Sequence, residues 1–300
     1  PVYNEEENIN IFFEKIKQIL LNYSYEIIFC VDPGQDNTEK LIKNICKNNK
    51  NVKALFFSRK FGQPSATMAG IKNSIGKTCV IIDVDLQDPP ELIVDMYKHY
   101  LEGYNAVLAK RRTRKNESII KIISSKIAYK LINYFSDSNI PVDIGDFRLI
   151  DQKIVKELIN LDEKNIYLKG LVSYIGYKQK VIEFDRKERL HGNSKYKHYG
   201  SFSIFFSGLF GFSAKPLNFL LLGGALISIL SFIMLCAVLI SKFIFSVDFP
   251  VGIPTIIISI FLFAGIQLAS IGILGQYVAR IFDEVKKRPS YIIKEKINID

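Results

Sequence analysis

The chain has 300 residues, of which 48% are hydrophobic, and it carries a formal net charge of +10 at pH 7. This length and apolar content are sufficient for a sizeable core and predict one to three domains. The positive charge indicates an anionic partner, which leaves nucleic acid, a lipid headgroup surface and a phosphorylated substrate open. The cysteines and histidines have no paired spacing, which argues against a disulfide framework and against a His- or Cys-based metal centre. These residues are Cys30, Cys46, Cys79, Cys236, His99, His191 and His198.

The first residues, PVYNEEEN, read as a loop at the start of the chain. They begin with neither Met nor a signal peptide, and no hydrophobic strand precedes them. We therefore expect the natural chain to begin earlier and an edge or central strand of the sheet to precede Pro1.

From residue 25 onward, strand-like and helix-like runs alternate. Strands are predicted at 25–32, 52–57, 79–83 and 105–110, and helices at 37–49, 64–75 and 89–103. Such alternation predicts a parallel sheet covered by helices, an α/β fold. Ligands of these sheets bind outside the carboxyl ends of the strands, where Asp32 and Asp83 lie.

The stretch CVIIDVDLQDPPE places two carboxylates at the end of a predicted strand. Side chains two residues apart on a strand point the same way, so Asp83 and Asp85 are expected to converge on one point. Hard oxygen ligands suit Mg²⁺ or Mn²⁺, and Gln87 would add a third oxygen. A solvated acidic loop is the alternative, because this pattern alone is weak.

Two long uncharged runs follow in the second half of the chain, Pro216–Ser241 and Phe249–Ala279. Each exceeds the ~20 residues needed to cross a bilayer, so we predict two transmembrane helices, with a buried helix of a soluble domain as the alternative. Basic residues on the outer flanks of both runs predict that both flanks are cytoplasmic. Before the first run, residues 118–135 read as a basic amphipathic helix and residues 199–212 are rich in Phe, and both are candidates for the membrane interface.

Five motifs carry a resemblance to a known family. They occur in the order PVYNEEEN, FSRKFGQPSATMAGI, DVDLQDPPEL, GDFRLID and RLHGNSKY. Together they resemble the family-2 glycosyltransferases of the polyprenyl-phosphate branch, which includes dolichyl-phosphate mannose synthases and bacterial undecaprenyl-phosphate (bactoprenol) glycosyltransferases.

This resemblance implies a domain organisation. A cytosolic GT-A domain, Rossmann-like with a mostly parallel sheet, is expected at residues 1–198, followed by an interfacial amphipathic segment at 199–215. A two-helix transmembrane hairpin is expected at 216–241 and 251–279, with a basic cytoplasmic tail at 280–300.

The resemblance also implies site residues. Donor-binding residues would be Pro1, Tyr3, Asn4, Glu5, Asp32, Lys60 and Gln63. The metal ligands for Mg²⁺ or Mn²⁺ would be Asp83, Asp85 and Gln87, and the catalytic residues Asp146, Arg148 and Asp85, with Asp146 a base or an orienting group. Acceptor-phosphate residues would be Arg111, Arg112, Arg189, Ser194 and Lys195. The loop VDPGQDNT departs from the family pattern at Pro33, so the sequence does not fix the nucleotide.

The implied reaction is metal-dependent, inverting transfer of a hexose from a nucleotide-diphosphate sugar, UDP-glucose or similar, to undecaprenyl phosphate. The partners would be this donor, the polyprenyl phosphate and the bilayer, with no nucleic acid and a possible homo-oligomer. The expected location is the bacterial inner membrane with the catalytic domain in the cytoplasm. Two alternatives are a membrane-tethered binding protein without turnover and a glycan-elongating transferase.

Overall fold

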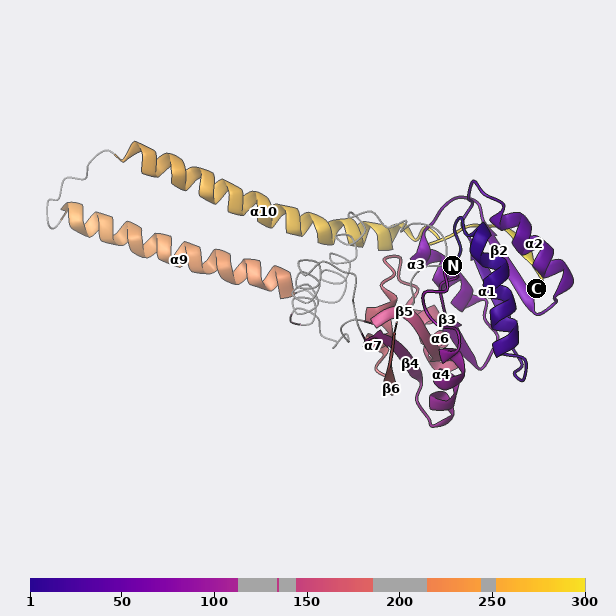
Figure 1. The fold of residues 1–300 in the computed structure, drawn as a ribbon. Coiled ribbons are helices and arrows are strands. Elements are labelled where there is room, and N and C mark those ends of the chain that lie inside the picture. Colours follow the sequence, from indigo (N-terminus) through magenta and orange to yellow (C-terminus); the bar gives the residue numbers. More distant parts are fainter. Residues whose placement is uncertain (113–133, 135–143, 186–214, 244–251, 300) are drawn as a thin grey trace.

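The structure is a computed structural model that describes residues 1–112, 134, 144–185, 215–243 and 252–299. A layered α/β domain and two long helices that project from it make up the described parts (Figure 1). The predicted helix at 118–135, apart from residue 134, and the predicted interfacial segment at 199–215, apart from Lys215, lie outside these residues.

Two small sheets lie within the domain. The first has the order β1-β2-β7, and its strands are β1 (Ile27–Val31), β2 (Val52–Phe57) and β7 (Ile293–Ile297). In it β1 and β2 are parallel and β7 runs antiparallel to β2. Val2 forms a parallel bridge with Val31 at the other edge.

The second sheet has the order β3-β5-β4-β6, and its strands are β3 (Thr78–Ile81), β4 (Ala106–Arg111), β5 (Ile144–Asp151) and β6 (Gln179–Phe184). Strand β5 is antiparallel to both of its neighbours, whereas β4 and β6 are parallel. The expectation of a mostly parallel sheet is therefore wrong for the described strands, which pair in a mixed way. The reason is that β5 inserts between β3 and β4 in the opposite direction.

Helices cover these sheets. They are α1 (Glu6–Ile19), α2 (Thr38–Asn48), α3 (Gln63–Lys72), α4 (Leu92–Leu101), α6 (Gln152–Leu161) and α7 (Leu168–Ile175). In α1, apolar side chains recur at helical spacing, and Ile9, Phe12, Phe13 and Ile16 are buried against the strands. Full burial of each such side chain stabilises the fold by about 1.5–3 kcal/mol. The core therefore forms between the helices and the two sheets and holds the strand ends in place.

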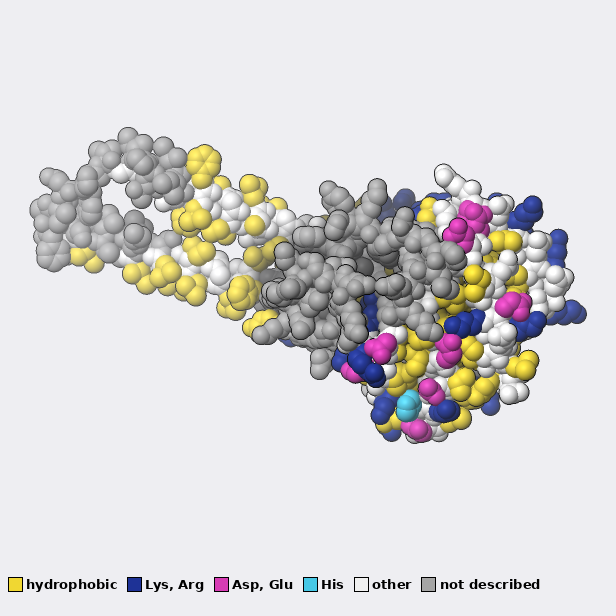
Figure 2. All heavy atoms as spheres, in the orientation of Figure 1, with side chains coloured by type: hydrophobic (Ala, Val, Ile, Leu, Met, Phe, Trp, Pro, Cys, Tyr) yellow, Lys and Arg dark blue, Asp and Glu magenta, His cyan; other side chains and the backbone are white. Residues whose placement is uncertain are grey.

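The two projecting helices are α9 (Lys215–Phe243) and α10 (Ile253–Lys286). Most of their described apolar side chains are exposed (Figure 2). Phe219 is 67% exposed and Phe261 is 74% exposed. Within the described side chains, one helical segment, Ser259–Lys286, is long and apolar enough to cross a membrane, and a shorter apolar stretch covers Leu217–Ile227. The second span and the hairpin stay predictions.

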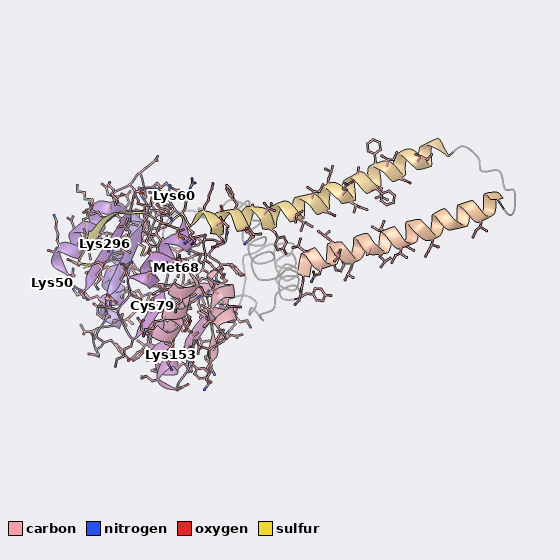
Figure 3. All side chains as sticks on the ribbon, turned by 180° about the vertical axis from the view of Figure 1, so that it is seen from behind. Lys50, Lys60, Met68, Cys79, Lys153 and Lys296 are labelled. Carbon is pink, nitrogen blue, oxygen red and sulfur yellow. The ribbon has the colours of Figure 1, made fainter. Side chains whose placement is uncertain are left out.

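Residues 280–299, the described part of the predicted tail at 280–300, do not form a separate tail. The first of them continue α10 to Lys286, and Ile293–Ile297 form β7 at the edge of the first sheet (Figure 3). Asn298 donates from Nδ2 to the carbonyl oxygens of Cys46 and Val52, at 2.9 and 2.7 Å. The chain therefore returns from the long helices and joins the domain.

Candidate active site

The two predicted carboxylates follow β3, close to β5. The β3–β5 register pairs Ile81 with Arg148, and continuing it by two residues sets Asp83 across from Asp146. After Asp83 the chain turns at Leu86, whose φ of 57° lies in the left-handed region. Such strained backbone clusters at functional sites. Asp85 is 5% exposed, and its Oδ1 accepts a hydrogen bond from the Gln87 backbone N–H at 3.2 Å.

Asp83 and Asp146 have opposite electrostatic surroundings. Burial, followed by the negative charges of Asp146, Asp85 and Asp88, raises the pKa of Asp83 to about 7. Partial burial alone would raise the pKa of Asp146 too, but the positive charges of its neighbours outweigh that effect and lower it. These neighbours are Lys169, Arg148 and Arg111. Negative charge is therefore in excess around Asp83 and compensated around Asp146.

Lys169 is a site residue that the motif analysis missed. It projects from α7, and its Nζ lies 3.7 Å from Asp146 Oδ1. It stands 23 positions after Asp146 on a different element, so no local spacing pointed to it. A positive charge at the second residue of α7, the second helix after GDFRLID, is a weak signal in the sequence.

Arg148 lies beside Asp146, and its side chain is buried. Its side chain is 1% exposed, and Nη2 lies 3.9 Å from Asp146 Oδ1. Its guanidinium donates to the backbone oxygens of Gly145 at 2.8 Å and Asp146 at 3.2 Å. Arg148 therefore supports the backbone and the charge of Asp146, and its catalytic role stays a prediction.

Arg111 and Arg112, at the end of β4, differ in their contacts. The Arg111 guanidinium lies over Gly145, where an added Cβ would be 3.7 Å from Nη2. Arg111 Nε is buried without a hydrogen-bond partner among the described residues. Arg112 is mostly exposed and pairs instead with Asp185 at 3.4 Å. Arg111 is thus the one that joins the Asp146 cluster. The other acceptor candidates, Arg189, Ser194 and Lys195, lie outside the described residues.

The donor candidates gather around the loop at residues 58–62, which we call the donor loop. Asp32 is 4% exposed, and its two carboxylate oxygens accept hydrogen bonds from Phe61 N at 2.8 Å and Gly62 N at 2.9 Å. This carboxylate therefore fastens the donor loop, and its contact with a base or ribose stays a prediction. Gln63 donates from Nε2 to Asp83 Oδ1 at 3.0 Å and so joins the donor loop to the carboxylates.

The remaining donor candidates belong to the first residues of the chain. Lys60 Nζ lies 3.4 Å from the centroid of the Tyr3 ring, a cation–π contact. Asn4 Oδ1 accepts from Gln35 N at 3.0 Å, which fastens the loop that departs from the family pattern. Glu5 accepts from Asn8 Nδ2 at 2.7 Å, and Pro1 is half-buried. These contacts bring residues 1–5 and the donor loop to the same end of the first sheet.

The site fits a divalent cation only together with a substrate. Within the described part of the chain, no group of three or more His, Cys, Asp or Glu side chains is arranged to hold a metal. Mg²⁺ and Mn²⁺ are commonly bound through one or two carboxylates plus substrate phosphates. Burial and the negative charges of neighbouring carboxylates raise the pKa of Asp83, and such a cation would neutralise this negative charge. Asp83 and Asp85 therefore fit a metal that a diphosphate completes.

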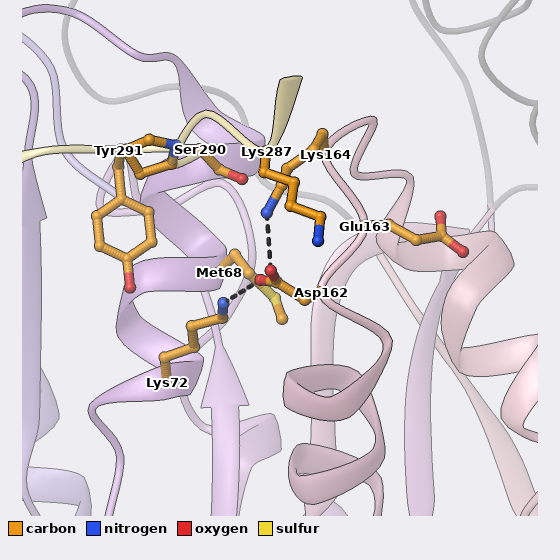
Figure 4. A pocket seen from close by; sticks show the side chains of 9 residues that line it. Met68, Lys72, Asp162, Glu163, Lys164, Lys287, Ser290 and Tyr291 are labelled. Carbon is orange, nitrogen blue, oxygen red and sulfur yellow. Dashed lines mark hydrogen bonds and ion pairs between the residues drawn. The ribbon is translucent and has the colours of Figure 1, made fainter. Parts of the chain in front are cut away.

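Two cavities lie away from this cluster. One of about 340 Å³ is lined by Met68, Lys72, Asp162 and Tyr291, among others (Figure 4). The other, about 470 Å³, lies between α1 and α2 and is lined by residues that include Glu6 and Lys40. Neither contains a site residue discussed above.

Comparison with known proteins decides the family. Residues 1–159 match the family described as Glycosyl transferase family 2. The chain belongs to this family. It is therefore a glycosyltransferase, and the expected GT-A class of α/β fold is confirmed.

Several relatives match this glycosyltransferase over nearly their whole length. The uncharacterized glycosyltransferase YkcC of Bacillus subtilis is 38% identical over 100% of this chain and 93% of its own. The uncharacterized glycosyltransferase sll0501 of Synechocystis is 36% identical over 98% of this chain and 93% of its own. The prophage bactoprenol glucosyl transferase homolog of Escherichia coli is 35% identical over 98% and 96%.

Proposed function

We propose that this glycosyltransferase moves a hexose from a nucleotide-diphosphate sugar to a polyprenyl phosphate at a membrane surface. The observation that carries the proposal is the near full-length similarity to a protein named a bactoprenol glucosyl transferase homolog. A strand-end cluster of carboxylates beside basic side chains, in a domain joined to an exposed apolar helix, supports it. UDP-glucose is the donor we propose first.

Asp83 and Asp85, with Gln87 as a further oxygen, would hold the divalent cation against the donor diphosphate. When bound, Mg²⁺ or Mn²⁺ would neutralise the negative charge that develops on the departing nucleoside diphosphate. Asp32 fastens the donor loop through Phe61 and Gly62. Lys60 and Gln63 would then approach the same diphosphate.

Asp146 would orient the acceptor side of the reaction. A phosphate monoester has a second pKa of about 6 and is largely dianionic at neutral pH, so the attacking oxygen needs little deprotonation. The lowered pKa of Asp146 keeps it charged but also makes it a weak base, so this carboxylate suits an orienting group better than a proton acceptor. Lys169 and Arg148 hold this carboxylate in place.

The acceptor phosphate would meet Arg111 first. Its buried Nε lacks a partner within the described residues, and a guanidinium offers paired donors that match phosphate oxygens. Arg189, Ser194 and Lys195 remain proposed acceptor contacts on the sequence motif alone. Arg112 is a weaker candidate because Asp185 already pairs with it.

The long helices would anchor the protein in the bilayer. Lipid is the environment that stabilises exposed apolar side chains such as Leu262 at 59% and Leu268 at 69%. With α9 as a second span, the hairpin would place the domain on the cytoplasmic side of a bacterial inner membrane. That position brings the catalytic cluster to the headgroup of a polyprenyl phosphate.

The test is transfer by the purified full-length protein in nanodiscs. Labelled UDP-glucose, UDP-N-acetylglucosamine and GDP-mannose are each offered with undecaprenyl phosphate and Mg²⁺ or Mn²⁺. We expect one sugar to enter the lipid fraction, and removal of the metal with EDTA to abolish the transfer. Transfer to a soluble glycan, with none to the lipid phosphate, would overturn the proposed acceptor.

A further inference from the structure

We propose that the C-terminal strand β7, through Tyr291 just before it, positions the donor loop at residues 58–62. The chain that leaves the long helix α10 would thereby set the geometry of the donor site. This inference rests on the proposed function in one respect, the assignment of the loop to the donor. The contacts themselves are independent of that assignment.

Backbone hydrogen bonds join the C-terminal segment to β2 and to Ser58, the first residue of the donor loop. Strand β7 pairs with β2 from Ala54 to Phe57, with an irregularity between Phe56 and Phe57. Beyond the strand, Ser58 N donates to Ile292 O at 3.0 Å. The donor loop therefore begins on a backbone that the C-terminal segment holds.

A chain of aromatic rings continues the connection into the loop. The Tyr291 ring lies 5.7 Å from the ring of Phe57, which is 1% exposed. Phe57 in turn meets Phe61 edge-on at 6.1 Å. These rings belong to one apolar cluster with Ala66 and Ala69 of α3. Tyr291 thus supports, through Phe57, the ring of Phe61 in the donor loop.

From Phe61 the contacts lead directly to the carboxylates. Phe61 N and Gly62 N donate to Asp32, and the next residue, Gln63, donates to Asp83. Gly62 has a φ of 89°, a conformation that side-chain-bearing residues rarely adopt, so this shape of the loop depends on glycine at position 62. A displacement of Phe61 would therefore move the groups that face the donor diphosphate.

The segment between α10 and β7 is also held at its other end, where the end of α10 contacts the domain. Glu284 Oε1 accepts from Lys164 N at 2.8 Å, and the segment from Lys287 to Tyr291 lines the cavity shared with Met68 (Figure 4). The segment between α10 and β7 is therefore held at both ends. Movement of α10 relative to the domain would be transmitted to Tyr291.

The experiment compares variants of the full-length protein in nanodiscs. Tyr291→Ala removes the ring, Tyr291→Phe keeps it, and Tyr291→Leu keeps apolar volume without it. Asn298→Ala is the matched control, because Asn298 fastens the far end of the same returning segment, away from the donor loop. Three quantities are measured: hydrogen exchange of residues 58–66, KM for UDP-glucose and undecaprenyl phosphate, and the thermal midpoint.

For Tyr291→Ala and Tyr291→Leu we expect faster exchange in the donor loop and a donor KM raised about threefold to tenfold, the size of one lost aromatic contact. The acceptor KM should change less than about twofold. A loss of stability alone would not raise the donor KM selectively. Tyr291→Phe should restore both values, and Asn298→Ala should lower the thermal midpoint without raising the donor KM.

Two results would overturn the inference. One is unchanged loop exchange and donor KM in Tyr291→Ala, and the other is an equal rise of the donor KM in Asn298→Ala, which would make the role one of general stability. If the wild-type protein transfers no sugar from any nucleotide, the proposed function fails instead, and the exchange comparison still decides whether Tyr291 holds the loop.

Discussion

Asp146 is surrounded by positive side chains from three elements. Lys169 comes from α7, Arg148 from β5 itself and Arg111 from β4. Arg148 also donates hydrogen bonds to the backbone, and Arg111 is proposed to bind the acceptor phosphate. For Lys169, the contact with Asp146 is the role that we propose. Its effect on Asp146 can therefore be tested separately.

Lys169→Met should lower turnover by about tenfold to a hundredfold, because a hydrogen bond or close contact to a charged group contributes about 1.5–3 kcal/mol. Lys169→Arg should retain most of the activity. Steady-state kinetics with both substrates measures the effect. Lys164→Met is the control, since Lys164 pairs with Asp162 at 2.7 Å and is not part of the cluster around Asp146. Equal losses in both variants would show that Lys169 only contributes stability.

The two carboxylates that we propose to bind the metal can be tested separately. Asp85→Asn should weaken Mn²⁺ binding in the presence of UDP by at least about tenfold, because one of two charged oxygen ligands is lost. Titration of the electron paramagnetic resonance signal of free Mn²⁺ measures this. Asp95→Asn, an exposed carboxylate on α4, should bind as the wild type does. Undiminished Mn²⁺ binding in Asp85→Asn would remove Asp85 from the ligand set.

At the scale of elements, the donor loop depends on one glycine. Gly62 combines a φ of 89° with a ψ of 167°, a region essentially confined to glycine. Gly62→Ala should therefore strain the loop by about 1–3 kcal/mol and raise the donor KM.

The matched control for this loop is Gly103→Ala in the turn after α4. Gly103 has a φ of 91° and nothing within 4 Å of an added Cβ, so the backbone penalty arises far from the site. Both variants should lose thermal stability, whereas only Gly62→Ala should raise the donor KM. A raised donor KM in both would mean that the kinetic effect reports stability and not loop shape.

The sequence predicts those elements that have a local pattern of apolar and turn-forming residues. The run VKALFF predicts a strand at 52–57, and β2 occupies Val52–Phe57, because apolar runs between turn residues need no distant partner to be recognised. Asp83 and Asp85 were found in the same way, from a strand end. The antiparallel insertion of β5 and the return of β7 depend on contacts between distant residues, which no spacing reveals. Lys169 and Tyr291 were missed for that reason.

The predicted transmembrane hairpin determines which side of the membrane each part of the chain faces. Asp248 lies in the predicted external turn, outside the described residues. In a chain without native cysteines, Asp248→Cys should react with an impermeant maleimide on intact cells. Leu101→Cys, at a position 67% exposed on the domain, should react only after the cells are opened. Reaction at position 248 only in opened cells would refute the hairpin.

If a polyprenyl phosphate is the acceptor, transfer changes the mass of this lipid, and that mass can be measured. Purified wild-type protein is incubated with undecaprenyl phosphate, Mn²⁺ and the nucleotide sugar that supports transfer, and the lipid extract is examined by mass spectrometry. We predict a species heavier than undecaprenyl phosphate by one sugar residue, formed by the wild type and at least about tenfold less by Asp85→Asn. Consumption of the nucleotide sugar without this species, or its equal formation by Asp85→Asn, would contradict the account.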